Sequence, residues 1–156
     1  MIEEKIGEAL GLEKAAQKAV EELDSRGLLE TEQMNKLSKM KEEAGEQEQQ
    51  MEDLVEQLTD SDGLNSEKIE STAEETAEKC SKMMETYLGE DPDTQEALEF
   101  LCLAEGGEVT HYEVLTAIAK DVKNKKFGTT VRAILKEEQG HLNLCTKLAK
   151  SNAAGG

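Results

Sequence analysis

The chain has 156 residues, 35 of them acidic and 18 basic, and its formal net charge at pH 7 is −17. Such an excess of carboxylates repels phosphate backbones and anionic membrane surfaces, so we expect neither nucleic-acid binding nor membrane-surface binding. No stretch approaches the roughly 20 apolar residues of a membrane-spanning helix. The N-terminus lacks the basic start and apolar run of a secretory signal, and we therefore expect a cytoplasmic protein.

The composition favours helices over strands. Hydrophobic residues make up 37% of the chain and aromatic residues 3%, the single proline is Pro92, and Glu, Lys, Ala, Leu and Gln are abundant. The length suits one domain, which we expect over residues 1–150, and the small residues 151–156 predict a flexible tail. The three cysteines include no Cys-x-x-Cys pair and are expected to be small core residues.

Apolar periodicity predicts five helices, over about 2–25, 31–58, 66–88, 93–122 and 127–150. Gly27, the turn at 60–63 and the segment 89–92 separate the first four, and Thr31 is the predicted N-cap of the second. Helices of this length joined by short turns pack as an antiparallel bundle, so we predict an all-α fold.

Several of the predicted apolar stripes contain acidic residues. Glu13 lies on the stripe of the first helix, Glu105 and Glu108 on that of the fourth, and Glu138 on that of the fifth, where His141 follows three residues later. A carboxylate on such a stripe must leave water, and it then needs a partner or a shifted pKa. Lys and Arg are scarce on these stripes, so a bound metal ion is the simplest partner.

Each of the two histidines follows a glutamate by three residues, in Glu108/His111 and in Glu138/His141. This spacing places both side chains on one helix face, where they can chelate one ion or a bridged pair of ions. His111 lies on the flank of its stripe and is expected at the surface or beside the site. For any single glutamate of so acidic a chain, a solvated position is the alternative.

Other residues near these motifs have simpler interpretations. Tyr112 is expected in the core, with hydrogen bonding to a metal-ligating carboxylate as the alternative role. The pairs 42–43 and 74–75 are acidic and are expected on solvated helix faces.

Two parts of the chain carry a resemblance to a known superfamily. Residues 104–108, Phe127 and residues 134–141 resemble the second half of rubrerythrins, which are ferritin-like proteins in which a Glu-x-x-Glu helix precedes a Glu-x-x-His helix by about this interval. Residues 79–83 and 111–113 are similar to the bacterial YciE/YciF stress-protein group. The resemblance covers most of the chain, and residues 104–142 are its specific part. It implies an antiparallel four-helix bundle with an additional helix between the second and third bundle helices.

The resemblance also implies a carboxylate-bridged site for two ions of Fe or Mn. The ligands carried over from it are Glu13, Glu105, Glu108, Glu138 and His141. The second helix departs from the family pattern because it has no histidine. Glu46 has the family spacing from Glu13, but it lies on the wrong side of the apolar stripe of the second helix. Glu48 or Gln47 would point inward instead. Glu46 and Glu48 are therefore both candidate ligands.

The function implied by the resemblance is oxidative-stress protection or iron handling, as a di-iron peroxidase or ferroxidase acting on O2 or peroxide. No four-cysteine electron-transfer domain is present in the chain, so turnover would need an external electron donor. Most oligomers are symmetric dimers, and a homodimer is expected. The alternatives are a non-enzymatic helical stress or interaction protein with a vestigial metal site, motivated by the missing second-helix histidine, and a coiled-coil adaptor.

Overall fold

Helices make up nearly all of residues 1–155, the part of the chain that this computed structural model describes. They are α1 (Ile2–Ser25), α2 (Thr31–Asp62), α3 (Ser66–Leu88), α4 (Thr94–Ile118) and α5 (Lys126–Gly155), and the 3-10 helix η1 (Ala119–Asp121) continues α4. The described residues contain no strand, so the protein is all-α, as its composition predicts. Within the same residues, none of the helices has the length and apolar run that crossing a bilayer requires.

Capping side chains set several helix boundaries. Asn65 and Asp93 accept hydrogen bonds from backbone N–H groups in the first turns of α3 and α4, and α2 ends at Gly63, whose φ of 66° suits a residue without Cβ. At the start of α2 the N-cap is Glu30 rather than Thr31, because the Gln33 side chain accepts from the Glu30 backbone N–H at 2.9 Å. The N-cap therefore lies one residue earlier than predicted.

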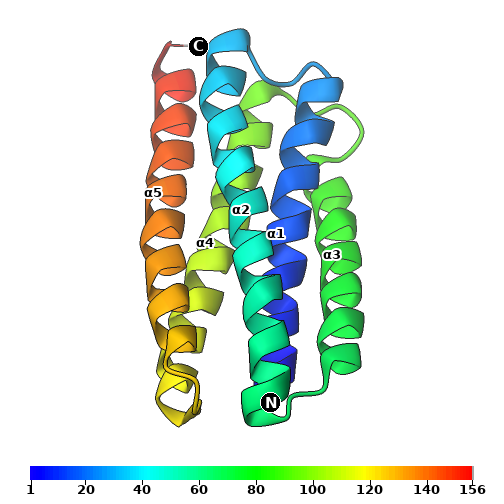
Figure 1. The fold of residues 1–156 in the computed structure, drawn as a ribbon. Helices are drawn as coiled ribbons and strands as arrows, with labels where there is room; N and C mark the ends of the chain where they lie inside the picture. The colour runs from blue at the N-terminus through cyan, green and yellow to red at the C-terminus, as the bar shows by residue number, and fades with distance from the viewer. Residues whose placement is uncertain (156) are drawn as a thin grey trace.

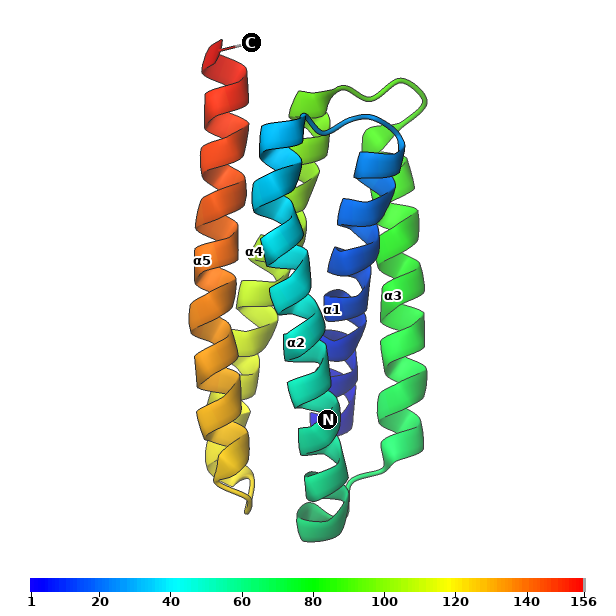
Figure 2. The same cartoon turned by 45° about the horizontal axis from the view of Figure 1, so that its top comes forward.

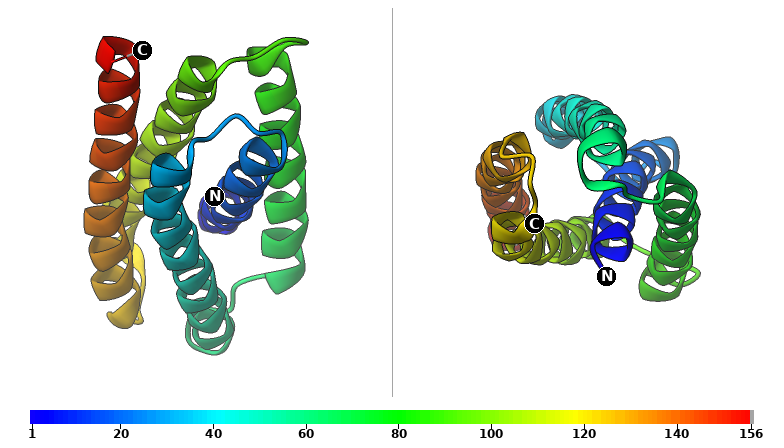
Figure 3. Two further views of the ribbon diagram at one scale, coloured as in Figure 1. Left: turned by 90° about the horizontal axis from the view of Figure 1, so that it is seen from above. Right: turned by 60° about the horizontal axis from the view of Figure 1, so that its bottom comes forward.

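The five helices alternate in direction along the long axis of the molecule (Figures 1 and 2). Helices α1 and α2 form one antiparallel pair and α4 and α5 another, while α3 runs back along the molecule and connects α2 to the parallel α4. Helices α1, α2, α4 and α5 lie around a common interior, and α3 packs against the outer side of α1 (Figure 3). The interior is thus enclosed by helices from both halves of the sequence.

The C-terminal segment differs from the predicted flexible tail. Helix α5 continues to Gly155, and Asn152 is bonded on both sides: its amide donates to Gln95 at 2.8 Å, and its carbonyl accepts from Gln33 at 3.3 Å. These two bonds tie the last turns of α5 to α4 and α2. Gly156 lies outside the described residues.

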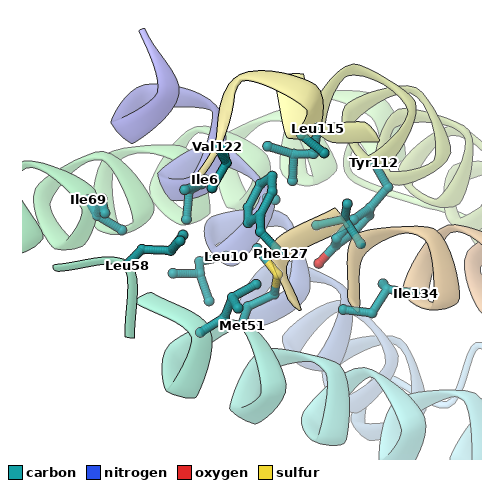
Figure 4. Close-up of a cluster of buried hydrophobic side chains, with 14 of the residues drawn as sticks. Ile6, Leu10, Met51, Leu58, Ile69, Tyr112, Leu115, Val122, Phe127 and Ile134 are labelled. Carbon is teal, nitrogen blue, oxygen red and sulfur yellow. The ribbon is translucent and has the colours of Figure 1, made fainter. Parts of the chain in front are cut away.

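The apolar core consists of two separate clusters. The lower cluster, at the end of the bundle that is drawn lowest in Figure 1, packs around Phe127 and includes Ile6, Leu58 and Leu115; Figure 4 shows its side chains. The upper cluster is formed by residues near the opposite ends of the same four helices and by the last turns of α3; its members include Val20, Leu23, Leu37, Leu98, Leu101 and Leu148. In every one of the four helices, the residues between the two clusters include a buried polar side chain. A polar layer therefore divides the core at mid-height.

The close approach of α1 to α3 depends on two glycines, Gly7 and Gly11. A Cβ on Gly11 would lie 2.6 Å from the Ala73 carbonyl oxygen and from the Thr76 Cβ, so the two backbones would have to separate. We expect Gly11→Ala to lower the free energy of unfolding by about 1–3 kcal/mol, the usual effect of overpacking. The measurement is urea denaturation followed by circular dichroism.

The matched control is Gly106→Ala on α4, whose Cβ would meet no atom within 4 Å. Alanine has the higher helix propensity, so this control should gain about 0.5–1 kcal/mol. The two changes in the free energy of unfolding need not be equal in size. A Gly11→Ala protein as stable as the wild type would contradict the packing argument.

Candidate metal centre

Four glutamates and one histidine from three helices meet in the polar layer between the two apolar clusters. Helix α1 supplies Glu13, α4 supplies Glu105 and Glu108, and α5 supplies Glu138 and His141. The four glutamates are 0–1% exposed and His141 is 5% exposed. Each helix buries its apolar stripe above and below the polar layer. An acidic residue that lies on the same face of the helix is therefore buried as well.

The ligand atoms of these five residues form two groups that share Glu138. One group contains Glu105, Glu138 and His141, and the other contains Glu13, Glu108 and Glu138. Within each group, one atom from every residue lies within 4.8 Å of the others. A shared carboxylate between two three-residue groups is the arrangement that bridges a pair of metal ions.

Most polar atoms of this cluster have no hydrogen-bond partner among the described residues. Both carboxylate oxygens of Glu13, Glu108 and Glu138 are unpartnered, and so are Glu105 Oε2 and His141 Nδ1. No buried Lys or Arg accompanies them. Buried polar atoms are nearly always satisfied, and an unpaired buried carboxylate is strongly unfavourable. The donor set therefore fits bound cations, which would satisfy several of these atoms at once.

The pKa values of the cluster residues are shifted by burial and by the charges of their neighbours. Burial, reinforced by the charges of neighbouring glutamates, raises the pKa of Glu13, Glu105 and Glu108 well above the ordinary value. Burial also acts to raise the pKa of Glu138, but His141, together with hydrogen bonding to Glu105 and Glu13, outweighs burial and holds that pKa below the ordinary value. For His141 the opposing effects are burial and the carboxylates of Glu138 and Glu43, and the carboxylates raise its pKa.

The two ring nitrogens of His141 face different partners. Nε2 lies 3.0 Å from Glu43 Oε1 on α2, and Nδ1 lies 3.4 Å from Glu138 Oε1 without forming a hydrogen bond. With Nε2–H donating to Glu43, the lone pair of Nδ1 is directed at the cluster. A carboxylate that orients a histidine through its second nitrogen is a common support for a metal ligand. Glu43 thus positions His141.

Glu43 was expected on a solvated helix face, and the structure instead shows it half-buried against His141. The reason is its place on α2, three residues after the buried Met40 and four before the buried Gln47, at the flank of the inward stripe. That spacing could have indicated partial burial, but not the contact with His141 on another helix.

Helix α2 presents Gln47, not a carboxylate, to the interior. Gln47 is 1% exposed, its Nε2 donates to Glu137 Oε1 at 2.8 Å, and its own Oε1 is unpartnered. Glu46 is exposed, and Glu48 is half-buried where it accepts a hydrogen bond from Gln17 at 2.8 Å. The structure therefore brings neither Glu46 nor Glu48 into the cluster, because each lies about 100° around the helix from Gln47.

Tyr112 and His111 are neighbours on α4 and lie about 100° apart around the helix. Tyr112 is fully buried with an unpartnered hydroxyl, and burial together with the surrounding glutamate charges raises its pKa well above the ordinary value. His111 lies outside the cluster, with Nε2 3.1 Å from Glu8 Oε2 and Nδ1 2.9 Å from the Gly107 carbonyl oxygen. Tyr112 therefore borders the site, and His111 instead links α4 to α1 near the surface.

A cavity of about 620 Å³ lies between α1, α3 and α4 and is lined by none of the five cluster residues. A smaller cleft of about 310 Å³ lies between α2 and α5 and has His141 in its lining. The volume of a cavity is therefore no guide to the site here, because the cluster is almost completely buried.

Comparisons with known proteins do not identify this chain: no family model, no curated protein and no solved structure matches it. The assignment of a site rests instead on chemistry. Four buried carboxylates and one imidazole, arranged as two groups with a common member, can bind divalent cations through oxygen ligands and one nitrogen ligand.

Proposed function

We propose that this chain is a di-metal protein that binds two divalent ions of Fe or Mn in the buried cluster. The observation that carries the proposal is the set of unpartnered buried carboxylate oxygens, contributed by three helices with no buried Lys or Arg among residues 1–155. Glu138 would bridge the ions, with Glu105 and His141 on one ion and Glu13 and Glu108 on the other.

Charge balance supports a pair of ions. Four ionised carboxylates carry four negative charges, and two divalent cations neutralise them, whereas a single ion would leave two uncompensated charges in the core. Carboxylate oxygens suit Mn²⁺, and imidazole nitrogen suits Fe and other transition metals, so the mixed set favours Fe or Mn over Ca²⁺ or Mg²⁺.

The helix arrangement supports a ferritin-like bundle as the finer description of the fold. Antiparallel pairs α1/α2 and α4/α5, joined by a long connection, are the topology of that bundle, and α3 would be the additional helix within the connection. Bundles of this kind build carboxylate metal sites from inward side chains at mid-height, which is where the present cluster lies.

Bound Fe or Mn would supply redox chemistry toward O2 or peroxide, and an oxidative-stress or iron-handling oxidase or peroxidase is the activity we propose. The chain's own contribution is to hold the ligands and to exclude water. The apolar clusters above and below the site limit solvent access, and Glu43 orients His141. Continued turnover would require an external electron donor. A cytoplasmic location and a homodimer stay predictions from the sequence.

The second candidate is a non-enzymatic helical stress or interaction protein with a vestigial site. The observation that favours it is Gln47, because α2 supplies no buried carboxylate and the site lacks the contribution of one helix. The two candidates differ in metal content, since a vestigial site would bind no ion at stoichiometric level.

The test is the metal content of chelator-free, untagged protein from medium supplemented with iron and manganese, measured by plasma mass spectrometry. We expect about two ions of Fe or Mn per chain, and about none in Glu138→Ala/His141→Ala, which removes the bridging carboxylate and the imidazole. Circular dichroism should stay helical in both proteins. As a matched control, Glu46→Ala on α2 should keep the wild-type content because Glu46 is exposed. Wild-type protein that binds no metal even after anaerobic Fe(II) loading would favour the vestigial site.

A further inference from the structure

The cleft between α2 and α5 leads from the surface toward the cluster. Its volume is about 310 Å³, and its lining includes Lys36, Lys39 and Glu43 of α2 and Glu137, Gly140 and His141 of α5. Among the helices around the interior, α2 and α5 are neighbours with few close backbone approaches (Figure 3). Side chains rather than backbones therefore form the walls on this side.

His141 connects this cleft to the buried carboxylates. It is the cluster residue that lines the cleft, and the four glutamates behind it are 0–1% exposed. Its Nδ1 faces Glu138, and its Nε2 faces Glu43, whose side chain is 36% exposed. A chain of polar groups thus leads from solvent, through Glu43 and His141, to the carboxylate shared by both ligand groups.

Two hydrogen bonds between side chains join α2 to α5 beside the cleft. One joins Glu43 to His141 at 3.0 Å, and the other joins Gln47 to Glu137 at 2.8 Å. Both bonds cross from α2 to α5, and each depends on side chains with several rotatable bonds. Rotation of these side chains would separate both pairs without any movement of a helix. Gly140 adds room, because a Cβ there would meet no atom within 4 Å.

We infer that divalent cations reach the buried cluster through this cleft, with Glu43 and Glu137 as the carboxylates that receive them from solvent. The inference rests on the proposed di-metal function. One carboxylate stands on each wall beside His141, so an arriving ion meets oxygen ligands before it reaches Nδ1. The two apolar clusters cover the site toward both ends of the bundle, and the cavity between α1, α3 and α4 has none of the five cluster residues in its lining.

Lys36 and Lys39 oppose this route electrostatically. They lie on α2 one to two turns beyond Glu43, both are exposed, and both line the cleft. Positive charge at the mouth lowers the local concentration of cations and slows their association. The lysines should therefore control the rate of loading without affecting the amount of metal bound.

The first test blocks the cleft. Gly140→Leu projects a side chain into it, and we expect this variant to load Mn²⁺ at least tenfold more slowly than wild type with the same final Mn²⁺ per chain. Metal-free protein is mixed with Mn²⁺, and the decay of the electron paramagnetic resonance signal of free Mn²⁺ gives the rate. The loading rate of Gly140→Ala should lie between those of wild type and Gly140→Leu. The matched control is Gly106→Leu on α4, which lines neither cavity and should load at the wild-type rate.

The second test changes the charge and leaves the shape of the helix unaffected, so it decides the question even if Gly140→Leu fails to fold. Lys36→Gln/Lys39→Gln should load Mn²⁺ several-fold faster at low ionic strength, and the gain should disappear in about 0.5 M salt, where charges are screened over a few ångströms. Wild-type rates in both the blocked and the charge variants would overturn the access route while leaving the site intact. Wild-type protein that binds no Mn²⁺ would overturn the route and the di-metal function together.

Discussion

Metal-free protein is expected to lose stability as the pH rises from about 5 to 8, and added Mn²⁺ is expected to reverse the trend. The cause is the raised pKa of Glu13, Glu105 and Glu108, which keep their protons in the folded state at pH values where the unfolded chain has lost them. The folded state then binds more protons than the unfolded state, so stability is greatest below the unfolded-state pKa and declines as the pH rises.

For each carboxyl that is protonated only in the folded state, the free energy of unfolding falls by about 1.4 kcal/mol for every unit by which the pH rises. For a chain of this size, 1 kcal/mol corresponds to about 2–4 °C in Tm, so several degrees per pH unit are expected. The raised pKa of His141 acts in the same direction above about pH 6.5. The lowered pKa of Glu138 contributes stability that is lost only in more acidic solution.

Metal binding displaces these protons, so its stabilising effect should grow with pH. At a free ion concentration one hundred times Kd, one site adds about 2.7 kcal/mol. Thermal denaturation of metal-free and Mn²⁺-loaded protein between pH 5 and 8 measures both trends. The control is metal-free Glu105→Gln/Glu108→Gln, in which two of the raised groups are absent and the acidic surface is the same. If its Tm falls with pH as steeply as that of wild type, the buried carboxyls are not the source.

Single substitutions in the cluster are expected to remove either one ion or both, according to the group to which the residue belongs. Glu138→Gln should abolish stoichiometric binding of both ions because Glu138 is common to the two groups. Glu13→Gln should leave about one ion per chain, held by Glu105, Glu138 and His141, since a structural ligand lost from one group leaves the other complete.

Isothermal titration of metal-free protein with Mn²⁺ gives the stoichiometry and affinity of each variant. The amide of Gln keeps the size of Glu, so loss of an ion is not a consequence of a cavity. Glu46→Gln on α2 serves as the matched control and should retain both ions, because this side chain is exposed. Equal losses in Glu13→Gln and Glu138→Gln would contradict the assignment of a shared ligand.

Helix phase explains how much of the site could be predicted from the sequence. The four buried glutamates each lie on the same helix face as an apolar stripe: Glu13, Glu105, Glu108 and Glu138. Because each residue advances the helix by a regular 100°, the sequence alone places these side chains in the interior. The all-helical fold could be predicted from the composition, and most helix boundaries from the turns that contain Gly and Asp. Local periodicity is therefore sufficient where one helix decides the position.

Features that depend on two helices could not be predicted in this way. Glu43 is at the flank of its stripe, and its role depends on how closely α5 approaches α2. The family spacing suggested Glu46, and helix phase left Gln47 and Glu48 as inward alternatives; Gln47 is the one that is buried, where it bonds to Glu137 on α5. The last turn of α5 was expected to fray because its residues are small, and it is held by the bonds of Asn152 to two other helices. Each of these is a tertiary contact.

The division of the core into two apolar clusters bears on the cooperativity of folding. The helices around the interior cross from one cluster to the other, and at the crossing level they meet through buried polar side chains rather than through packed apolar side chains. The two ends of the molecule are consequently linked mainly through the stiffness of the helices themselves. Ions bound at this level would add direct bonds between α1, α4 and α5, and would make the two ends open and close as one unit.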